Sequence, residues 1–265
     1  MAESPSANQR PIWPFIAGAA VIAVAVVGFF VVRDLVAFGR PVPEFPSLAD
    51  APDPSLHGTV AYFAVDAEPK TQPTGGCVRA VAAAGAPSKD VLCITEESYD
   101  TGPQLVFLPD GRLQVTMFSW EEDQPLAVAW QKIVDVRTGE TEDIVVAALP
   151  AVPVALGPTV TPTGERITAT SRGNTAEMVL TDSAGVSRTL WSADVSPDYG
   201  IKAIWAPNWE WVLAHDGRLL VVTVADPAQI RVLVAETEGL GDFGSTEPPL
   251  AFFAVTDADL LGAEG

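Results

Sequence analysis

The longest hydrophobic stretch of the chain runs without one charged residue from Ile12 to Val32. As a helix rising about 1.5 Å per residue, this stretch would span roughly 31 Å, the thickness of a bilayer's hydrocarbon core. Pro14 falls in what would be the first turn, where a helix tolerates proline. The pattern predicts a cytoplasmic tail over residues 1–11 and a single transmembrane helix over residues 12–33.

A cleaved signal peptide is the competing interpretation of this segment. Its apolar region is normally about 7–15 residues long, and no convincing A-x-A site follows the longer stretch found here. Ala37 and Gly39 could still serve as small residues at a cleavage site, so this alternative stays open. Positive charge does not set the orientation, because Arg10 lies on one side and Arg33 on the other.

Prolines crowd the segment that follows, with five between Gly39 and His57. This density excludes a regular helix and favours an extended chain of about 3.1 Å per residue. We therefore predict a semi-rigid stalk over residues 34–57. His57, at its end, is expected to be an exposed histidine without a role.

The two cysteines flank two short strand-like stretches, Cys77 to Ala82 and Lys89 to Ile94. The midpoint between them is Gly85, so in a hairpin folded there Cys77 and Cys93 would lie opposite each other on neighbouring strands. A metal site or a reactive thiol is the alternative, but no C-x-x-C occurs. The predicted disulfide, with an amino-terminal tail too short to fold, places the N-terminus in the cytoplasm and the large domain outside the cell membrane.

Beyond Tyr99, short apolar stretches alternate with turns, and three segments can be laid over one another: Gln104 to Phe118, Pro158 to Ser171 and Lys202 to His215. Their turns are Pro109-Asp110-Gly111, Pro162-Thr163-Gly164 and Pro207-Asn208-Trp209, about 53 and 45 residues apart. A second hairpin follows in each unit, turning at Thr138-Gly139, Ala184-Gly185 and Asp226-Pro227. Four strands per repeat of 40–50 residues are typical of a propeller blade.

The turns resemble the TolB-type, WD40-like propeller repeat, which has an aromatic-x-Pro-Asp-Gly turn followed by a small apolar strand. Phe107-Leu108-Pro109-Asp110-Gly111 and Trp205-Ala206-Pro207 carry the resemblance best, and it covers about residues 104–236. Only the first turn keeps Pro-Asp-Gly intact. The resemblance implies a β-propeller, and a fold of this kind does not by itself imply one function.

The two ends of the domain are expected to complete one blade together. Gly58 to Ile94 can supply three strands and Leu250 to Val255 one more. We predict an all-β domain over residues 58–256, a small propeller of about four blades, with a C-terminal tail over residues 257–265. An open, partial propeller and a β-sandwich are the alternatives.

Charge narrows the choice of partners. The chain has a net charge of −19; residues 1–40 carry three Arg and two acidic residues, so 12 basic and 32 acidic residues, a net charge of −20, lie beyond them. Such a surface repels phosphate backbones, which argues against nucleic acid as a partner. It would attract cations or a basic protein.

Motifs for catalysis are missing from the sequence. It contains no G-x-S-x-G, no H-E-x-x-H and no G-x-x-x-x-G-K-[ST]. His215 precedes Asp216-Gly217, a hairpin signal, and is expected to be an exposed turn residue. No catalytic residue, metal ligand or cofactor is therefore predicted, and calcium stays open because acidic residues are plentiful while no EF-hand loop appears.

Three tryptophans, Trp205, Trp209 and Trp211, surround one of the repeat turns. They could stack on a sugar or anchor a protein, although packing in the blade core is the expected role, with Trp209 and Trp211 on one face of a strand. We predict a non-catalytic, membrane-anchored interaction platform for another envelope or membrane protein. The alternatives are a cell-wall carbohydrate binder, a carboxylate-dependent glycoside hydrolase or a transmembrane signalling regulator.

Overall fold

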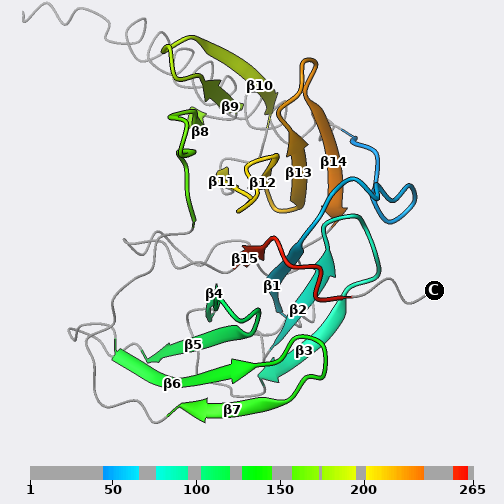
Figure 1. Cartoon of the computed structure of the whole chain (residues 1–265), viewed down its shortest axis with the longest axis vertical. Coiled ribbons are helices and arrows are strands. Elements are labelled where there is room, and N and C mark those ends of the chain that lie inside the picture. Colours follow the sequence, from blue (N-terminus) through cyan, green and yellow to red (C-terminus); the bar gives the residue numbers. More distant parts are fainter. Residues whose placement is uncertain are drawn as a thin grey trace, which may run out of the picture. The chain divides into compact units, whose positions relative to one another are not determined.

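The computed structural model describes residues 44–65, 76–94, 103–119, 127–144, 157–172, 175–194, 201–235 and 253–261. These residues contain no helix and form antiparallel strands arranged in four sheets (Figure 1). No helix long and apolar enough to cross a bilayer occurs in the described ranges. The predicted membrane span over residues 12–33 lies outside them.

Each sheet is built largely from consecutive strands. The first has the order β15-β1-β2-β3 and the second the order β4-β5-β6-β7, with bounds β1 (Thr59–Val65), β2 (Gly76–Ala82), β3 (Lys89–Ile94), β15 (Phe253–Thr256), β4 (Gln104–Phe107), β5 (Leu113–Ser119), β6 (Ala127–Val134) and β7 (Thr141–Ile144). The third has the order β10-β9-β8 and the fourth β11-β12-β13-β14, with bounds β8 (Arg166–Arg172), β9 (Thr175–Thr181), β10 (Ser187–Asp194), β11 (Lys202–Trp205), β12 (Trp211–His215), β13 (Leu219–Thr223) and β14 (Gln229–Val234).

The two ends of the domain share the first sheet, as the sequence predicted. β15 pairs antiparallel with β1, with Thr59 opposite Thr256 and Tyr62 opposite Phe253. The chain after β15 stays attached, because the Leu260 amide donates to Thr59 Oγ1 at 3.0 Å. The side chain of Leu260 is buried, so the packed part of the chain extends beyond residue 256, the predicted end of the domain.

The repeat turns have one geometry in three sheets. In each, the amide of the third turn residue donates to the carbonyl of the residue before the proline, from Gly111 to Leu108, from Gly164 to Thr161 and from Trp209 to Ala206, at 2.9–3.0 Å. All three third residues have positive φ, at 84°, 90° and 61°. Glycine adopts this region without strain, and the third repeat places tryptophan there instead.

The second hairpins also form where the turn residues predicted them. β6 pairs with β7 around Gly139, β9 with β10 around Gly185, and β13 with β14 around Pro227. Along β9, burial alternates so that Ala176, Met178 and Leu180 face the core. Period-2 patterning of this kind is what gives one sheet face to the interior.

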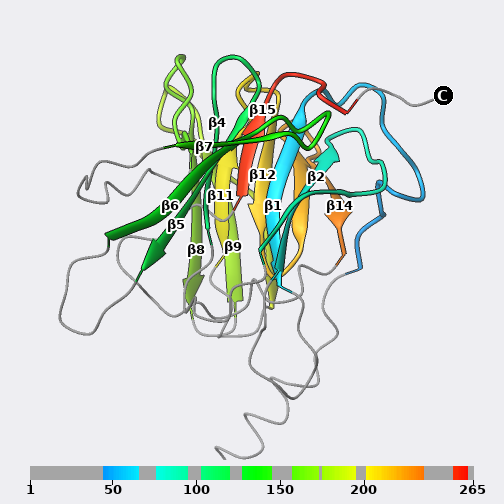
Figure 2. The same ribbon diagram turned by 90° about the horizontal axis from the view of Figure 1, so that it is seen from below.

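Three hydrophobic clusters join the sheets in pairs. One contains residues of the first and second sheets, one of the first and fourth, and one of the third and fourth. Within the described residues, none of these clusters joins the second sheet to the third. In Figure 2, β1 runs beside β2 and β5 beside β6, as their pairing requires. Four antiparallel sheets stacked through shared cores make a partial propeller-like fold.

Candidate functional site

A buried histidine and a half-buried lysine lie at one end of the fourth sheet. Lys202 begins β11 and His215 ends β12, and the two are register partners. His215 is only 8% exposed, which contradicts the prediction of an exposed turn histidine. β12 continues through His215, the turn begins at Asp216, and the ring of Phe253 lies 6.2 Å from the imidazole. Phe253 belongs to β15, near the other end of the domain, so the residues around His215 do not indicate this burial.

Burial sets the protonation of this pair. Burial is the main cause and the charge of Lys202 a smaller one; against the opposing effect of Asp216, they lower the pKa of His215 to about 4. Burial also lowers the pKa of the Lys202 ammonium. At neutral pH the imidazole is therefore uncharged and can both donate and accept a hydrogen bond.

The turn after His215 is held by an internal ion pair. Asp216 has 1% of its side chain exposed, and its Oδ2 lies 2.6 Å from Nη2 of Arg218. Oδ1 of Asp216 also accepts from the Arg218 backbone amide at 3.1 Å and from Nε at 3.2 Å. The Arg218 guanidinium lies 5.2 Å from the centroid of the Phe45 ring. These contacts fix the turn beside Lys202 and His215.

Buried ionisable groups with shifted pKa values often mark functional sites. Lys202 and His215 place an ammonium beside a neutral imidazole at the end of the fourth sheet. A general base for neutral pH has a pKa near 7, well above that of His215. The lowered pKa therefore argues against His215 as a general base at neutral pH.

The three tryptophans occupy different environments. Trp205 and Trp211 are each 1% exposed and belong to the cores between sheets, as expected for packing residues. Trp209 lies in the turn rather than in a strand, so the prediction that it shares a strand face with Trp211 is wrong. It is half-buried against the cluster of the third and fourth sheets. Of these three residues, only Trp209 presents part of its ring to solvent.

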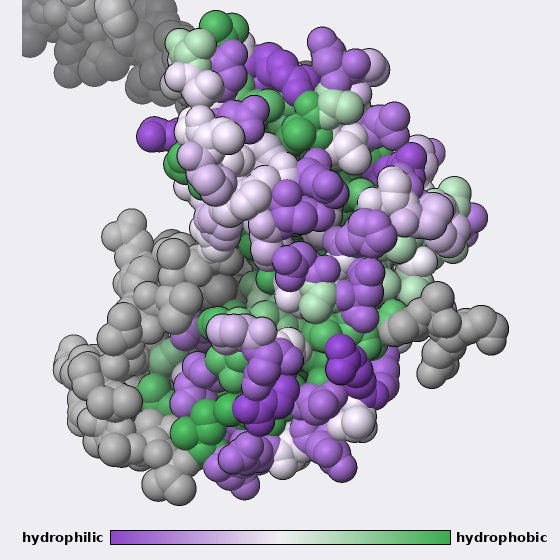
Figure 3. Space-filling model, in the orientation of Figure 1, coloured by the Kyte–Doolittle hydropathy of each residue, from purple (hydrophilic) through white to green (hydrophobic). Residues whose placement is uncertain are grey.

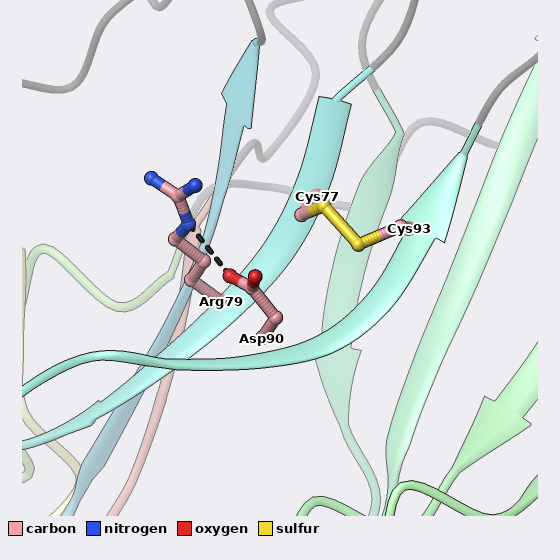
Figure 4. Close-up of a disulfide and its surroundings, with 4 residues drawn as sticks. All are labelled: Cys77, Arg79, Asp90 and Cys93. Atoms are coloured by element: carbon pink, nitrogen blue, oxygen red, sulfur yellow. Dashed lines mark hydrogen bonds and ion pairs between the residues drawn. A yellow bond between two sulfur atoms is a disulfide. The ribbon is translucent and has the colours of Figure 1, made fainter.

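Cys77 and Cys93 form the predicted disulfide (Figure 4). They are register partners on β2 and β3, with Cα atoms 4.0 Å apart. Arg79 and Asp90 form an ion pair beside the bridge, with Nε and Oδ1 2.8 Å apart. Asp90 lies close to both sulfur atoms, but the S–S bond leaves neither as a thiolate that could bind a metal.

Many basic side chains on the domain are neutralised by neighbouring carboxylates. Arg112 lies 2.8 Å from Asp110, and Lys132 lies 2.5 Å from Asp143. The hydrogen bonds from Arg112 lower the pKa of Asp110, which keeps that carboxylate charged. On the face shown in Figure 3, hydrophilic side chains cover most of the described surface. With cations paired locally and acidic residues in excess, the domain presents net negative charge to solvent.

His57 is exposed, as predicted, with 60% of its side chain accessible. Its Nδ1 lies 3.3 Å from Oδ2 of Asp259, and Oδ1 of the same carboxylate accepts from the Gly58 amide at 2.7 Å. The histidine therefore lies where the segment before β1 meets the segment after β15.

Comparison with known proteins leaves the family open. No protein-family model and no curated protein matches the chain. Among solved structures, it is similar to a periplasmic gluconolactonase from Pseudomonas aeruginosa, with 14% identity and a TM-score of 0.23 over 66% of this chain and 53% of that one. It is also similar to a protein from Lactobacillus plantarum, with 10% identity and a TM-score of 0.23 over 67% and 66% of the two chains. The chain thus spans about half the length of the first, and likeness this weak carries no argument about function.

Proposed function

We propose that the chain is an extracytoplasmic protein of the cell membrane, in which one N-terminal helix anchors an acidic propeller-like domain that binds another envelope protein. The disulfide between Cys77 and Cys93 supports the location, because such bonds persist in oxidising compartments and are rare in the cytosol. The uncharged stretch from Ile12 to Val32 supports the anchor.

The binding proposal rests on the ion pairs that basic side chains of the domain form with neighbouring carboxylates. Arg112, Lys132 and Arg218 all have carboxylates within 2.5–2.8 Å, so they add little positive potential to the surface. A partner with a basic surface would be steered to the domain and held by complementary charge. The interaction should therefore weaken as salt concentration rises.

We also infer that the second, third and fourth sheets, within about residues 104–236, are blades of the TolB-type repeat. The turns at Gly111, Gly164 and Trp209 support this assignment, because they have the same backbone hydrogen bond. Each turn also joins the first two chain segments of its repeat. The carbohydrate alternative has less support: burial of Trp205 and Trp211 leaves only Trp209, of the three, with a ring face for stacking.

The test is purification of tagged full-length protein from its native membranes in mild detergent, with mass spectrometry of proteins recovered in near-equal amount. We expect one stoichiometric partner, which is released when the salt concentration is raised. A chain carrying residues 1–57 alone is the control and should recover none of it. Recovery of the full-length protein without any stoichiometric partner would count against the proposal, and glycan binding by the domain would then be measured.

A further inference from the structure

A bulge in the β2–β3 hairpin brings a carboxylate onto the same face as the disulfide. Cys77 and Arg79 are two residues apart on β2, whereas their register partners, Cys93 and Asp90, are three apart on β3. In a regular strand, residues three apart point to opposite faces, and the extra residue at the register shift corrects this. The ion pair and the disulfide therefore lie on one face of the hairpin (Figure 4).

The two sulfur atoms and a carboxylate oxygen of Asp90 form a compact group of ligand atoms, all within 4.8 Å of one another. Two thiolates that bind one zinc ion at about 2.3 Å each stand about 3.8 Å apart at the tetrahedral angle. That separation is close to the 4.0 Å between the Cα atoms of Cys77 and Cys93. Rotation of the two side chains can therefore exchange the S–S bond for two S–Zn bonds without parting the strands.

Arg79 orients the carboxylate and balances the charge of this group. Its Nε donates to Oδ1 of Asp90 at 2.8 Å. A carboxylate has two oxygens with about four acceptor positions, so it can accept from a guanidinium and bind a metal together. An outer partner of this kind is usual for metal ligands. Two thiolates and one carboxylate exceed the charge of a zinc ion by one negative charge, and the guanidinium of Arg79 neutralises it.

The group is open to solvent on the side of β3. Cys93 is exposed, and the side chain of Asp90 is 56% accessible, whereas Cys77 is only 6% exposed. A thiol reductant can therefore reach Sγ of Cys93, and a metal ion can approach from the same side. Thiolates favour zinc over calcium or magnesium, and a tetrahedral site with one carboxylate and one water suits it.

We propose that reduction of the disulfide converts this hairpin into a zinc site, with Cys77, Cys93 and Asp90 as ligands and water in the fourth position. A dithiol reductant passes two electrons to the S–S bond, which breaks to give two thiols while the reductant becomes a disulfide. Zinc then displaces the two thiol protons. In the reverse direction, a disulfide oxidant takes two electrons from the thiolates, the S–S bond forms again and zinc is released. This site is independent of the proposed anchor and partner.

Metal titration of full-length protein without a polyhistidine tag tests the site. The protein, in detergent micelles, is reduced with dithiothreitol, freed of reductant without oxygen, and titrated with Co²⁺ and then Zn²⁺. We expect one Co²⁺ per chain with thiolate-to-cobalt charge-transfer absorption, which Zn²⁺ abolishes, and no such absorption from the oxidised chain. Its absence from protein in which two free thiols are counted would overturn the proposal.

Two carboxylate variants distinguish the site from a pair of free thiols. Loss of an outer partner costs about 10–100-fold in metal affinity, so Asp90→Asn, which removes a ligand, should weaken zinc binding by at least about tenfold. Asp143→Asn is the matched control, because Asp143 is also exposed and pairs with a cation, Lys132, on the neighbouring strand. The urea midpoints of both oxidised variants report that the fold is kept. Equal zinc affinities of the two reduced variants would overturn the proposal.

Oxidation of the zinc-loaded protein tests the reverse step. Oxidised glutathione is added in the presence of a chromophoric zinc chelator, and thiols are counted over time. We expect two thiols to be lost for each zinc ion released. Loss of both thiols with zinc still bound to the protein would contradict the proposed ligands.

Discussion

Substituting Gly58 with alanine tests whether the C-terminal strand closes the first sheet. Gly58 has a φ of 116°, and a Cβ at this position would lie 2.3 Å from the carbonyl oxygen of Thr256. Because that atom belongs to the backbone at the end of β15, the strand cannot yield by a side-chain rotation. Either β15 or the turn that follows it must move away from β1.

The size of the effect follows from what β15 buries. Phe253 is 2% exposed and lies in the core between the first and fourth sheets, and losing the burial of such a phenylalanine costs about 3–5 kcal/mol. Gly185→Ala is the matched control, since its φ is 86° and its Cβ would meet nothing within 4 Å. Backbone strain alone should cost about 1–2 kcal/mol there.

Urea unfolding of the oxidised domain, residues 43–265, followed by tryptophan fluorescence, gives both free energies of unfolding. We expect Gly58→Ala to lose roughly 2–3 kcal/mol more than Gly185→Ala. Equal losses would refute the reasoning, because they would mean that β15 does not lie against Gly58.

Three further predictions concern the buried histidine, the disulfide and the tryptophans of the third repeat turn. Because the pKa of His215 is lowered in the folded domain, its imidazole stays neutral there, while in the unfolded chain it takes up a proton below about pH 6.5. Between pH 7 and pH 5, the free energy of unfolding of the native domain should therefore fall by about 2 kcal/mol more than that of His215→Gln. Parallel curves of stability against pH would contradict this. Replacing Cys77 and Cys93 together by serine should lower the free energy of unfolding by about 3 kcal/mol, measured by urea titration against the oxidised domain; an unchanged midpoint would argue against the bridge. Trp211→Ala should cost about 3–5 kcal/mol, and Trp209→Gly less, because glycine relieves the positive φ; the reverse order in thermal melts would exclude this account of the turn.

Local turn chemistry made much of the fold predictable. Gly111, Gly164 and Gly185 stand where the chain needs positive φ, and their spacing indicated the hairpins before any contact was known. The cysteines predicted the register of β2 and β3 because a bridge between neighbouring strands requires opposed residues. The join between β1 and β15 was predictable because two short apolar stretches at the ends of the domain resemble each other.

Long-range packing accounts for what the sequence analysis missed. The burial of His215 depends on Phe253, nearly 40 residues away in the sequence. Trp209 occupies the positive-φ position of its turn, where the other two repeats have glycine, so its residue type did not indicate a turn. The prolines correctly excluded a regular helix from residues 44–57, but the predicted extended stalk is wrong there, because these residues form turns and pack against β14. Leu48 and Leu56, two apolar residues in that Pro-rich segment, were the available signal.

We propose that the domain lies outside a membrane to which the chain is anchored, and one labelling experiment tests this most directly. A cysteine at Val186, whose side chain position is 66% exposed, gives a direct readout, because both native cysteines are held in the disulfide. Full-length Val186→Cys protein in spheroplasts should react with a membrane-impermeant maleimide and remain with the membranes after alkaline washing. Reaction only after lysis, or release of the labelled protein by the wash, would contradict the account.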